Sequence, residues 1–339
     1  MNNCLITGGA GFIGTNLAQR LIRSGKKVRI LDNLSRAGVD KNLIWLQKNF
    51  AGQFEFIKED VRNFGALHDA VRGVDTIFHF ASQVAVTTSV ADPRTDFEIN
   101  AGGAFNILEA ARLSGNSPAI LFTSTNKVYG KMEDMEVVEK NGRYELAKLP
   151  QGVDESQPLD FYSPYGCSKG TGDQYMRDYA RIYGMKTVVF RMSCIYGYHQ
   201  FGNEDQGWVA HFILSALFGH PLKIYGDGKQ VRDILFVDDL TEAFCRAAEN
   251  LDQTAGQVFN IGGGTQNSIS LLELISILEE ISGQKIPVEY FDWRPGDQKV
   301  YVSNIARAKR IFHWQPRISR EEGIRRLYDW AQKNQNMFK

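Results

Sequence analysis

The sequence is poor in cysteine, and the few cysteines it has are scattered. Among 339 residues there are four, Cys4, Cys167, Cys194 and Cys245, and no two of them form a CxxC or CxxH pair. Zinc sites and disulfide frameworks need regularly or closely spaced ligands. We therefore expect reduced thiols and no bound metal, as in a protein of a reducing intracellular compartment.

The sequence also lacks an excess of either charge and any long apolar run. Lysine plus arginine and aspartate plus glutamate each number 39, so no basic field is available for nucleic acid or an anionic membrane. No segment approaches the length of a membrane span. The start, MNNCLITGG, has neither the basic nor the apolar region of a secretory signal. We expect a soluble cytoplasmic protein.

What the sequence does contain is an alternation of short apolar runs with amphipathic stretches, typical of a parallel sheet covered by helices. The runs that predict strands lie at 4–7, 28–33, 54–60, 76–82, 119–125 and 186–193. Several amphipathic stretches between them end in glycine, which is a helix-stop signal. Six strands with intervening helices predict an α/β fold with a Rossmann-type doubly wound parallel sheet.

The character of the sequence changes after about residue 194. The predicted elements there are, in order, a polar and aromatic binding loop at 196–208, a buried strand at 258–264, a helix at 270–283 and a second loop at 293–300. We expect an NAD-binding Rossmann domain over 1–193, with returning segments near 234–264. A smaller C-terminal lobe, mainly 194–339, is expected to bind the substrate.

A glycine-rich segment, TGGAGFIG at 7–14, lies directly between the first predicted strand and the first predicted helix. Its glycines permit a tight turn and a close approach of the backbone to a pyrophosphate, and the helix N-terminus supplies N–H groups. Asp32 stands 18 residues beyond Gly14, where a carboxylate accepts the adenosine ribose hydroxyls and repels a 2′-phosphate. This arrangement predicts NAD, while the nearby Arg36 leaves NADP open.

Tyr165 and Lys169 are four residues apart in the segment SPYGCSKG at 163–170. On a helix this spacing places both side chains on one face, one turn apart. Neighbours at this spacing are also common by chance, so the pair alone does not identify an acid–base couple.

The motifs in combination resemble the extended short-chain dehydrogenase/reductase family. They are TGGAGFIG, the HFA of 79–81, TSTNKVYG at 123–130 and YGCSK at 165–169, and the resemblance covers essentially the whole chain. It implies a Rossmann-type sheet, tightly held NAD and a catalytic set of Ser/Thr, Tyr and Lys. Carried over by position, that set is Thr125, Tyr165 and Lys169.

The chemistry of a tyrosine base is consistent with this carry-over. A free phenol titrates near pH 10, whereas an ammonium one turn away and a positive nicotinamide ring favour the phenolate, by a shift of roughly 3 units. Tyr165 would take the proton of a sugar hydroxyl, Lys169 would hold the nicotinamide ribose, and Thr125 would hydrogen-bond the reacting oxygen.

Within that family, Asn126 and Lys127 stand where nucleotide-sugar 4,6-dehydratases carry an Asp-Glu pair, and neither can supply that acid and base. The wider text resembles CDP-tyvelose (CDP-paratose) 2-epimerases, in STNKVYG, DFEINAGGAFNILEA, DESQPLDFYSPYGCSKG, the DQGW of 205–208 and GKQVRD at 228–233. The resemblance implies that C2 of a CDP-linked hexose or deoxyhexose is oxidised by bound NAD to a 2-keto intermediate and reduced again on its other face. A C4 epimerase of a UDP- or GDP-sugar and a non-catalytic NAD-binding sensor remain as alternatives.

The resemblance also assigns candidate residues. The cofactor contacts are Gly8, Gly11, Phe12, Ile13, Asp32, Asn33, Ser35, Arg36, Asp60, Val61, Phe80, Ala81, Gln83, Asn100, Ser124, Tyr165, Lys169, Met192 and Ser193. The substrate contacts are Thr125, Asn126, His199, Gln200, Gln206, Arg232, Arg294 and Asp297.

Several of these residues carry more specific expectations. Arg232 and Arg294 resemble the arginines that clamp the diphosphate, and Asp297 is expected to orient Arg294 or to contact ribose. Asp60 is placed at the end of the third strand, beside the adenine. Asn100 is expected at the start of a helix, either supporting the active-site backbone or acting only as an N-cap.

The resemblance implies a homodimer or higher homo-oligomer as well. Its interface would use two long helices per subunit, which are expected to begin near Gly102 and Tyr165.

Overall fold

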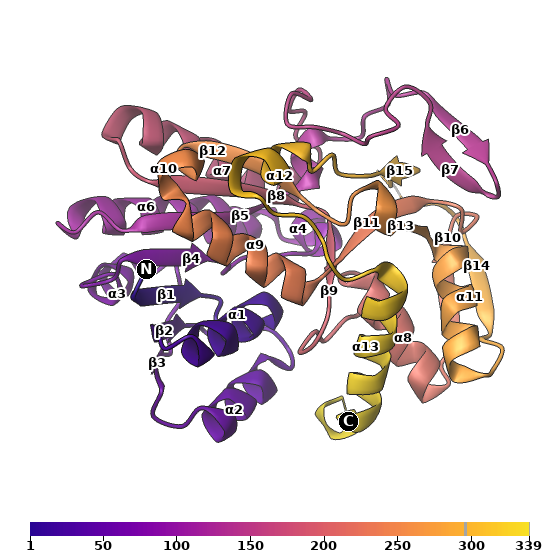
Figure 1. Ribbon diagram of the computed structural model, residues 1–339, viewed down its shortest axis with the longest axis horizontal. Coiled ribbons are helices and arrows are strands. Elements are labelled where there is room, and N and C mark those ends of the chain that lie inside the picture. The colour runs from indigo at the N-terminus through magenta and orange to yellow at the C-terminus, as the bar shows by residue number, and fades with distance from the viewer. Residues whose placement is uncertain (295–296, 339) are drawn as a thin grey trace.

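The computed structural model describes residues 1–294 and 297–338, so Pro295 and Gly296 of the predicted loop 293–300 lie outside the described residues. Its central feature is a seven-stranded parallel sheet (Figure 1). In spatial order the strands are β12 (Gln257–Ile261), β8 (Thr187–Met192), β5 (Ala119–Thr125), β4 (Thr76–His79), β1 (Asn3–Thr7), β2 (Lys27–Leu31) and β3 (Phe54–Ile57). This order confirms the predicted Rossmann-type fold.

Helices cover both faces of this sheet because successive side chains of each buried strand point to opposite faces. On one face lie α1 (Phe12–Arg23), α2 (Val39–Asn49), α9 (Val237–Glu249), α10 (Leu251–Thr254) and α12 (Ala306–Phe312). On the other lie α3 (Phe64–Ala70), α6 (Gly103–Leu113) and α7 (Ser163–Tyr183). The short helices α4 (Val86–Ala91) and α5 (Pro93–Phe97) pack against α7, and a π-helix, Glu98–Gly102, joins α5 to α6.

A smaller lobe stands beside the carboxyl ends of the sheet strands, at the right of Figure 1. Its strands are β9 (Cys194–Tyr196), β11 (Val231–Phe236), β13 (Ser268–Ser270) and β15 (Val300–Tyr301) in one sheet, and β10 (Leu222–Tyr225) with β14 (Val288–Phe291) in another. Helices α8 (Trp208–Phe218), α11 (Leu271–Ser282) and α13 (Arg320–Lys333) pack around them. Short 3₁₀ turns occur at Asn126–Tyr129, Thr265–Asn267 and Gln335–Met337.

The predicted strands are all present, although several of them end earlier than expected. Strands β2, β3 and β4 stop at Leu31, Ile57 and His79, and the last residue pair of β2 and β3 is Leu31 with Ile57. Asp60 therefore does not close the third strand, because the ladder has already ended and the chain has entered a turn. The strand predicted at 258–264 is β12, which returns to the sheet beside β8.

Other elements were not predicted. A hairpin of β6 (Val137–Lys140) and β7 (Arg143–Leu146) projects at the upper right of Figure 1.

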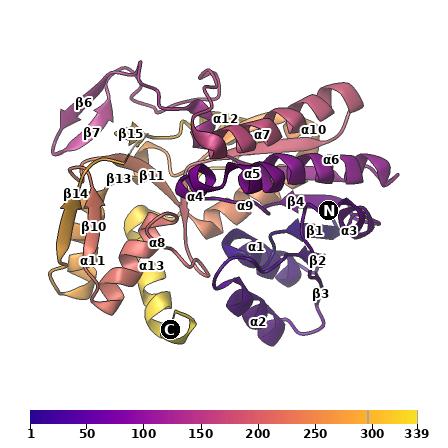
Figure 2. The same ribbon diagram turned by 180° about the vertical axis from the view of Figure 1, so that it is seen from behind.

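Seen from behind, α4, α5, α6 and α7 form one layer above the sheet (Figure 2). In the part of the chain that the structure covers, no helix is both long enough and apolar enough to cross a membrane.

Candidate active site

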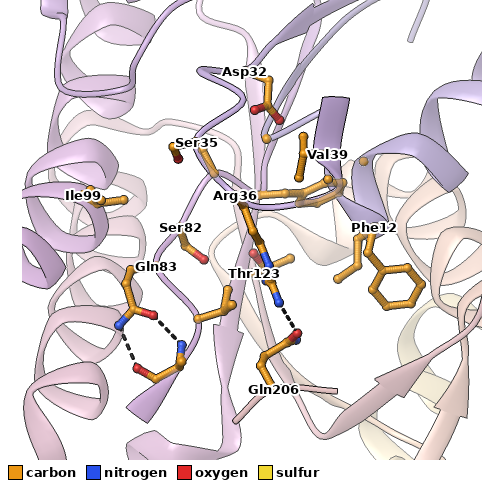
Figure 3. A pocket seen from close by; sticks show the side chains of 18 of the residues that line it. Phe12, Asp32, Ser35, Arg36, Val39, Ser82, Gln83, Ile99, Thr123 and Gln206 are labelled. Atoms are coloured by element: carbon orange, nitrogen blue, oxygen red, sulfur yellow. Dashed lines mark hydrogen bonds between the residues drawn. The ribbon is translucent and has the colours of Figure 1, made fainter. Parts of the chain in front are cut away.

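A cavity of about 530 Å³ opens at the carboxyl ends of the sheet strands, where β1 and β4 lie side by side and the strand order reverses. Figure 3 shows part of its wall. The predicted residues that line it are Gly8, Gly11, Phe12, Ile13, Asp32, Asn33, Ser35, Arg36, Asp60, Val61, Phe80, Ala81, Gln83, Ser124, Tyr165, Lys169, Met192, His199, Gln200 and Gln206. Asn100, Thr125, Asn126, Ser193, Arg232, Arg294 and Asp297 lie outside this wall.

The glycine loop after β1 is packed so closely that side chains are excluded. A Cβ atom at Gly8, whose φ is +68°, would lie 2.7 Å from the Ala81 nitrogen, and one at Gly14 would collide with the Gly8 carbonyl oxygen. Helix α1 begins after Gly11 without a side-chain cap. Its first N–H groups are therefore free for an anion, as a pyrophosphate site requires.

Asp32 follows β2 directly and lies in the cavity wall with 8% of its surface exposed. Its carboxylate accepts hydrogen bonds from the backbone N–H groups of Ala10 (3.1 Å) and Leu34 (2.8 Å). Burial raises the pKa of Asp32, whereas these backbone bonds lower it. The carboxylate thus joins the glycine loop to the end of β2, beside the cavity.

The neighbouring polar residues pair with one another. Asn33 donates to Asp60 (2.8 Å), and Arg62 also bonds Asp60, so that the pKa of Asp60 falls to about 2. The Arg36 guanidinium donates to the Gln206 side chain, which comes from the C-terminal lobe (Figure 3). Arg36 thus spans the cavity toward the other lobe.

The predicted catalytic residues come from two neighbouring elements. Thr125 ends β5, and its Oγ1 accepts a hydrogen bond from the Lys127 backbone N–H (3.2 Å). Tyr165 and Lys169 lie on the first turns of α7, and the Lys169 ammonium stands 4.6 Å from the centre of the Phe122 ring. A side-chain hydrogen bond joins Tyr165 to Thr125. Tyr165 and Lys169 therefore lie in the cavity wall, and Thr125 lies next to Tyr165 just outside it.

Burial dominates the protonation of this pair. It raises the pKa of Tyr165 to about 12, although the bond with Thr125 lowers it, and it lowers the pKa of Lys169 to about 7. Desolvation disfavours the charged form of each group, so Tyr165 is a phenol when the protein groups act alone. The expected shift toward the phenolate, which also involves the nicotinamide ring, stays a prediction for the NAD-loaded protein.

A buried polar network lies behind the catalytic helix. The Asp96 carboxylate accepts hydrogen bonds from Ser168 (2.5 Å), Gln83 (2.8 Å) and Asn100 (3.0 Å). Asn100 also accepts a bond from the Gln83 backbone N–H (2.9 Å). Asn100 is not at a helix start, because α5, the π-helix and α6 run on continuously and its side chain points inward to the backbone of Gln83.

The cavity has unused hydrogen-bonding capacity. Ser124 Oγ and Gln200 Oε1 are buried without a partner among the described residues, and both residues line the cavity. Buried polar atoms of this kind require a partner. The close glycine loop, the Asp32 carboxylate and these two atoms together fit a dinucleotide.

His199 and Gln200 lie in the loop after β9, and each is 2% exposed. The His199 ring centre is 4.3 Å from that of Trp45 and 5.1 Å from that of Trp330, and Nδ1 meets the Asn42 amide at 3.2 Å. Burial lowers the pKa of His199 to about 4. His199 therefore joins α2 to the C-terminal lobe as a neutral imidazole.

The basic residues of the second lobe are partly paired. Arg232 forms an ion pair with Asp297 (2.9 Å), so Asp297 does not orient Arg294 through its side chain as expected. The Arg294 guanidinium lies 3.9 Å above the Tyr225 ring and donates to the Glu204 carbonyl oxygen (3.2 Å). The attraction of a cation to an aromatic face accounts for this position of Arg294.

Three further predicted residues, Met192, Ser193 and Asn126, follow or end the strands at this end of the sheet. Met192 ends β8 in the cavity wall, whereas Ser193 turns away and donates to the Asp233 carboxylate (2.5 Å). The Asn126 amide oxygen accepts a bond from Thr125 (3.3 Å). Ser193 and Asn126 are thus held by neighbouring protein groups.

Two residues near the site were missed or set aside in the sequence reasoning. Asp96 has no distinctive motif around it, and only its burial behind α7 marks it out. The sequence analysis considers Lys127 only as a base and does not assign it a role as a cation. Its position two residues after Thr125 is the sequence feature that indicates a place near the catalytic residues.

Comparisons with known proteins agree with this geometry. The model of the NAD dependent epimerase/dehydratase family matches residues 4–262. The CDP-paratose 2-epimerase of Salmonella typhi is 45% identical over 337 residues, covering 96% of this chain and 98% of that protein. The structure of UDP-glucose 4-epimerase from Thermotoga maritima with UDP-glucose has a TM-score of 0.84 at 30% identity, covering 98% of this chain and 99% of that one. The UDP-glucose 4-epimerase of Thermus thermophilus, solved with NAD, has a TM-score of 0.81 at 30% identity, with coverage of 98% and 99%.

Proposed function

Because the chain belongs to the NAD dependent epimerase/dehydratase family, we propose that it is a nucleotide-sugar epimerase that inverts C2 of a CDP-hexose or CDP-deoxyhexose. The substrate pair would be CDP-paratose and CDP-tyvelose, or CDP-glucose and CDP-mannose. The observation that carries the proposal is the position of Tyr165 and Lys169 in the wall of the dinucleotide cavity, with Thr125 next to Tyr165. The 45% identity to a CDP-paratose 2-epimerase supports the choice of carbon and nucleotide.

In this mechanism the protein moves one proton and holds the sugar. The glycine loop and Asp32 would hold NAD, which when bound would supply the hydride acceptor and donor for the sugar carbon. Tyr165 accepts the hydroxyl proton from the reacting oxygen and later gives it back, while Thr125 hydrogen-bonds that oxygen. Lys169, when protonated, would stabilise the phenolate of Tyr165 as the proton leaves.

We further propose a division of labour between the lobes. Residues 1–193, with returning segments near 234–264, would bind NAD through Asp32 and the glycine loop. Residues 194–339 would mainly bind the nucleotide sugar, with Arg232 and Arg294 as diphosphate ligands. Arg232 lies on β11 and Arg294 follows β14, two strands of the smaller lobe, and these positions support the assignment.

A panel of four sugars tests the proposed substrate. Purified protein is incubated with CDP-glucose, CDP-paratose, UDP-glucose and GDP-mannose, and the inverted carbon is identified by proton NMR. We expect conversion of a CDP sugar at C2 only. Inversion at C4 of the UDP or GDP sugar would contradict the proposal.

The C4 alternative has its own support. A putative UDP-glucose 4-epimerase of Methanocaldococcus jannaschii is 32% identical over 332 residues, so the similarity of this chain also extends to a protein named for inversion at C4. The C4 reaction would require the sugar to present its far side to Tyr165.

A further inference from the structure

Lys127 carries a positive charge that the protein does not neutralise. It lies in the 3₁₀ turn Asn126–Tyr129 after β5, is half-buried, and is anchored through its backbone N–H to Thr125 Oγ1 (3.2 Å). Within the described residues, neither a hydrogen bond nor an ion pair is found for its ammonium group. The charge therefore stands two residues from the catalytic threonine without a counterion.

The groups that act electrostatically on Lys127 come from the C-terminal lobe and from the strand that leads into it. They are Arg232 on β11, Asp297 between β14 and β15, and Cys194 on β9. Cys194 pairs in register with Ile234, two residues beyond Arg232, so these groups form one wall facing the end of β5. Burial and Arg232 lower the pKa of Lys127, whereas Asp297 raises it.

Lys127, Arg232 and Asp297 together carry a net positive charge when Lys127 is protonated. Asp297 is bonded to Arg232 at 2.9 Å, so its carboxylate compensates Arg232 rather than Lys127. A half-buried ammonium beside a second cation is unfavourable in the free protein, and an incoming anion removes that cost. A diphosphate group that met both Lys127 and Arg232 would therefore be stabilised by the two positive charges.

We propose that Lys127 holds the sugar-side phosphate of the nucleotide diphosphate, and that this contact makes C2 the carbon that meets Tyr165. The inference rests on the proposed function and names the residue that sets its regiochemistry. The sugar-side phosphate is bonded through oxygen to C1, and C2 is the ring carbon next to C1. C4 lies across the ring. Because C2 is bonded to C1 and C4 is not, a phosphate held close to Thr125 would place C2 nearer than C4 to the catalytic pair.

A comparison of CDP binding with CMP binding tests the contact between Lys127 and the sugar-side phosphate, because only CDP carries that second phosphate. Titration calorimetry is carried out on the NAD-loaded protein and its Lys127→Gln variant. We expect CDP to bind the variant at least tenfold more weakly and CMP to bind within twofold of the original protein. The Lys140→Gln variant, at an exposed position of the β6–β7 hairpin, is the matched control and should change neither.

Two results would overturn the role of Lys127. Equal weakening of CDP and CMP would mean that Lys127 contacts the nucleoside or supports the fold, and unchanged binding of both would mean that it contacts neither. The melting temperature and NAD content of the variant identify misfolding independently. Should the original protein bind UDP more tightly than CDP, the proposed nucleotide is wrong, and the same comparison with UDP and UMP still tests Lys127. Inversion at C4 by the original protein would overturn the link between Lys127 and C2.

Discussion

At the scale of single residues, burial rather than charge pairing sets the starting protonation of the active site. Tyr165 is held as a phenol, with its pKa at about 12, and Lys169 titrates near 7. The residues that bear the chemistry were recognisable because they sit in short local motifs. Their partners were not, since Arg232 and Asp297 are 65 positions apart and Asp96 reaches Ser168 across 72.

Replacement of Tyr165 tests the proton transfer. The Tyr165→Phe variant should lose turnover by at least about 10³-fold, because a proton-transfer group contributes roughly 10²–10⁴. NAD content, measured after gel filtration and denaturation, should stay unchanged. The exposed Tyr162, replaced by Phe, is the control. A Tyr165→Phe variant with full activity would show that another group is the base.

His199 should make the stability of the protein depend on pH. Its pKa is about 4 in the folded protein and about 6.5 when unfolded, so the unfolded state binds more protons between these values. Folding stability contributed by this residue is therefore lost as the pH falls below about 6.5. The His199→Asn variant suits the left-handed backbone, φ +65°, although it loses packing at every pH.

Urea unfolding at pH 7.5 and 5.5 measures this contribution. The loss of unfolding free energy between the two values should be about 1.4 kcal/mol smaller in His199→Asn than in the original protein. An identical pH dependence in the two proteins would mean that the pKa of His199 is the same in the folded and unfolded states.

At the scale of elements, the glycine loop and the β strands follow from local sequence, whereas the small strands of the C-terminal lobe do not. Buried strands such as β5 read as continuous apolar runs because both faces are covered. Strands β13 and β15 have three and two residues, too few to show a period, and they form only by pairing with β11. The half-exposed hairpin β6–β7 is mostly polar and gave no signal.

The glycine loop can be tested by adding single methyl groups. In Gly14→Ala the new Cβ would collide with the backbone of Gly8, so the phosphate loop must move and NAD affinity should fall at least tenfold. In Gly65→Ala, on α3, the nearest atom is 3.6 Å away, and alanine favours the helix by about 1 kcal/mol. Tryptophan fluorescence titration with NAD compares the two. Equal affinity of both variants would contradict the tight fit at Gly14.

At the scale of the whole molecule, one outer layer carries an unusual number of exposed apolar side chains. They are Phe97, Phe105, Leu113, Tyr175, Ile182 and Tyr183, on α5, α6 and α7. A contiguous apolar face of this kind marks an interaction site. We propose that a second copy of the chain covers it, in line with the homodimer expected through α6 and α7.

The proposed dimer predicts a specific effect of charge on this face. Ile182 is 66% exposed, and Ile182→Glu should convert a dimer into a monomer in multi-angle light scattering. Ile44 is similarly exposed, at 62%, on α2, and Ile44→Glu should leave the mass unchanged. A monomeric original protein, or a dimer that survives Ile182→Glu, would contradict the assignment.

The central claim is that one sugar carbon is oxidised and reduced within a single active site, without exchange with solvent. The most direct test is conversion of CDP-glucose in heavy water, with the product examined by proton NMR. The account predicts the 2-epimer with its original hydrogen at C2 and no deuterium there. Deuterium at C2 of the product would mean that the carbon loses a proton to solvent, and the oxidation–reduction mechanism would be wrong.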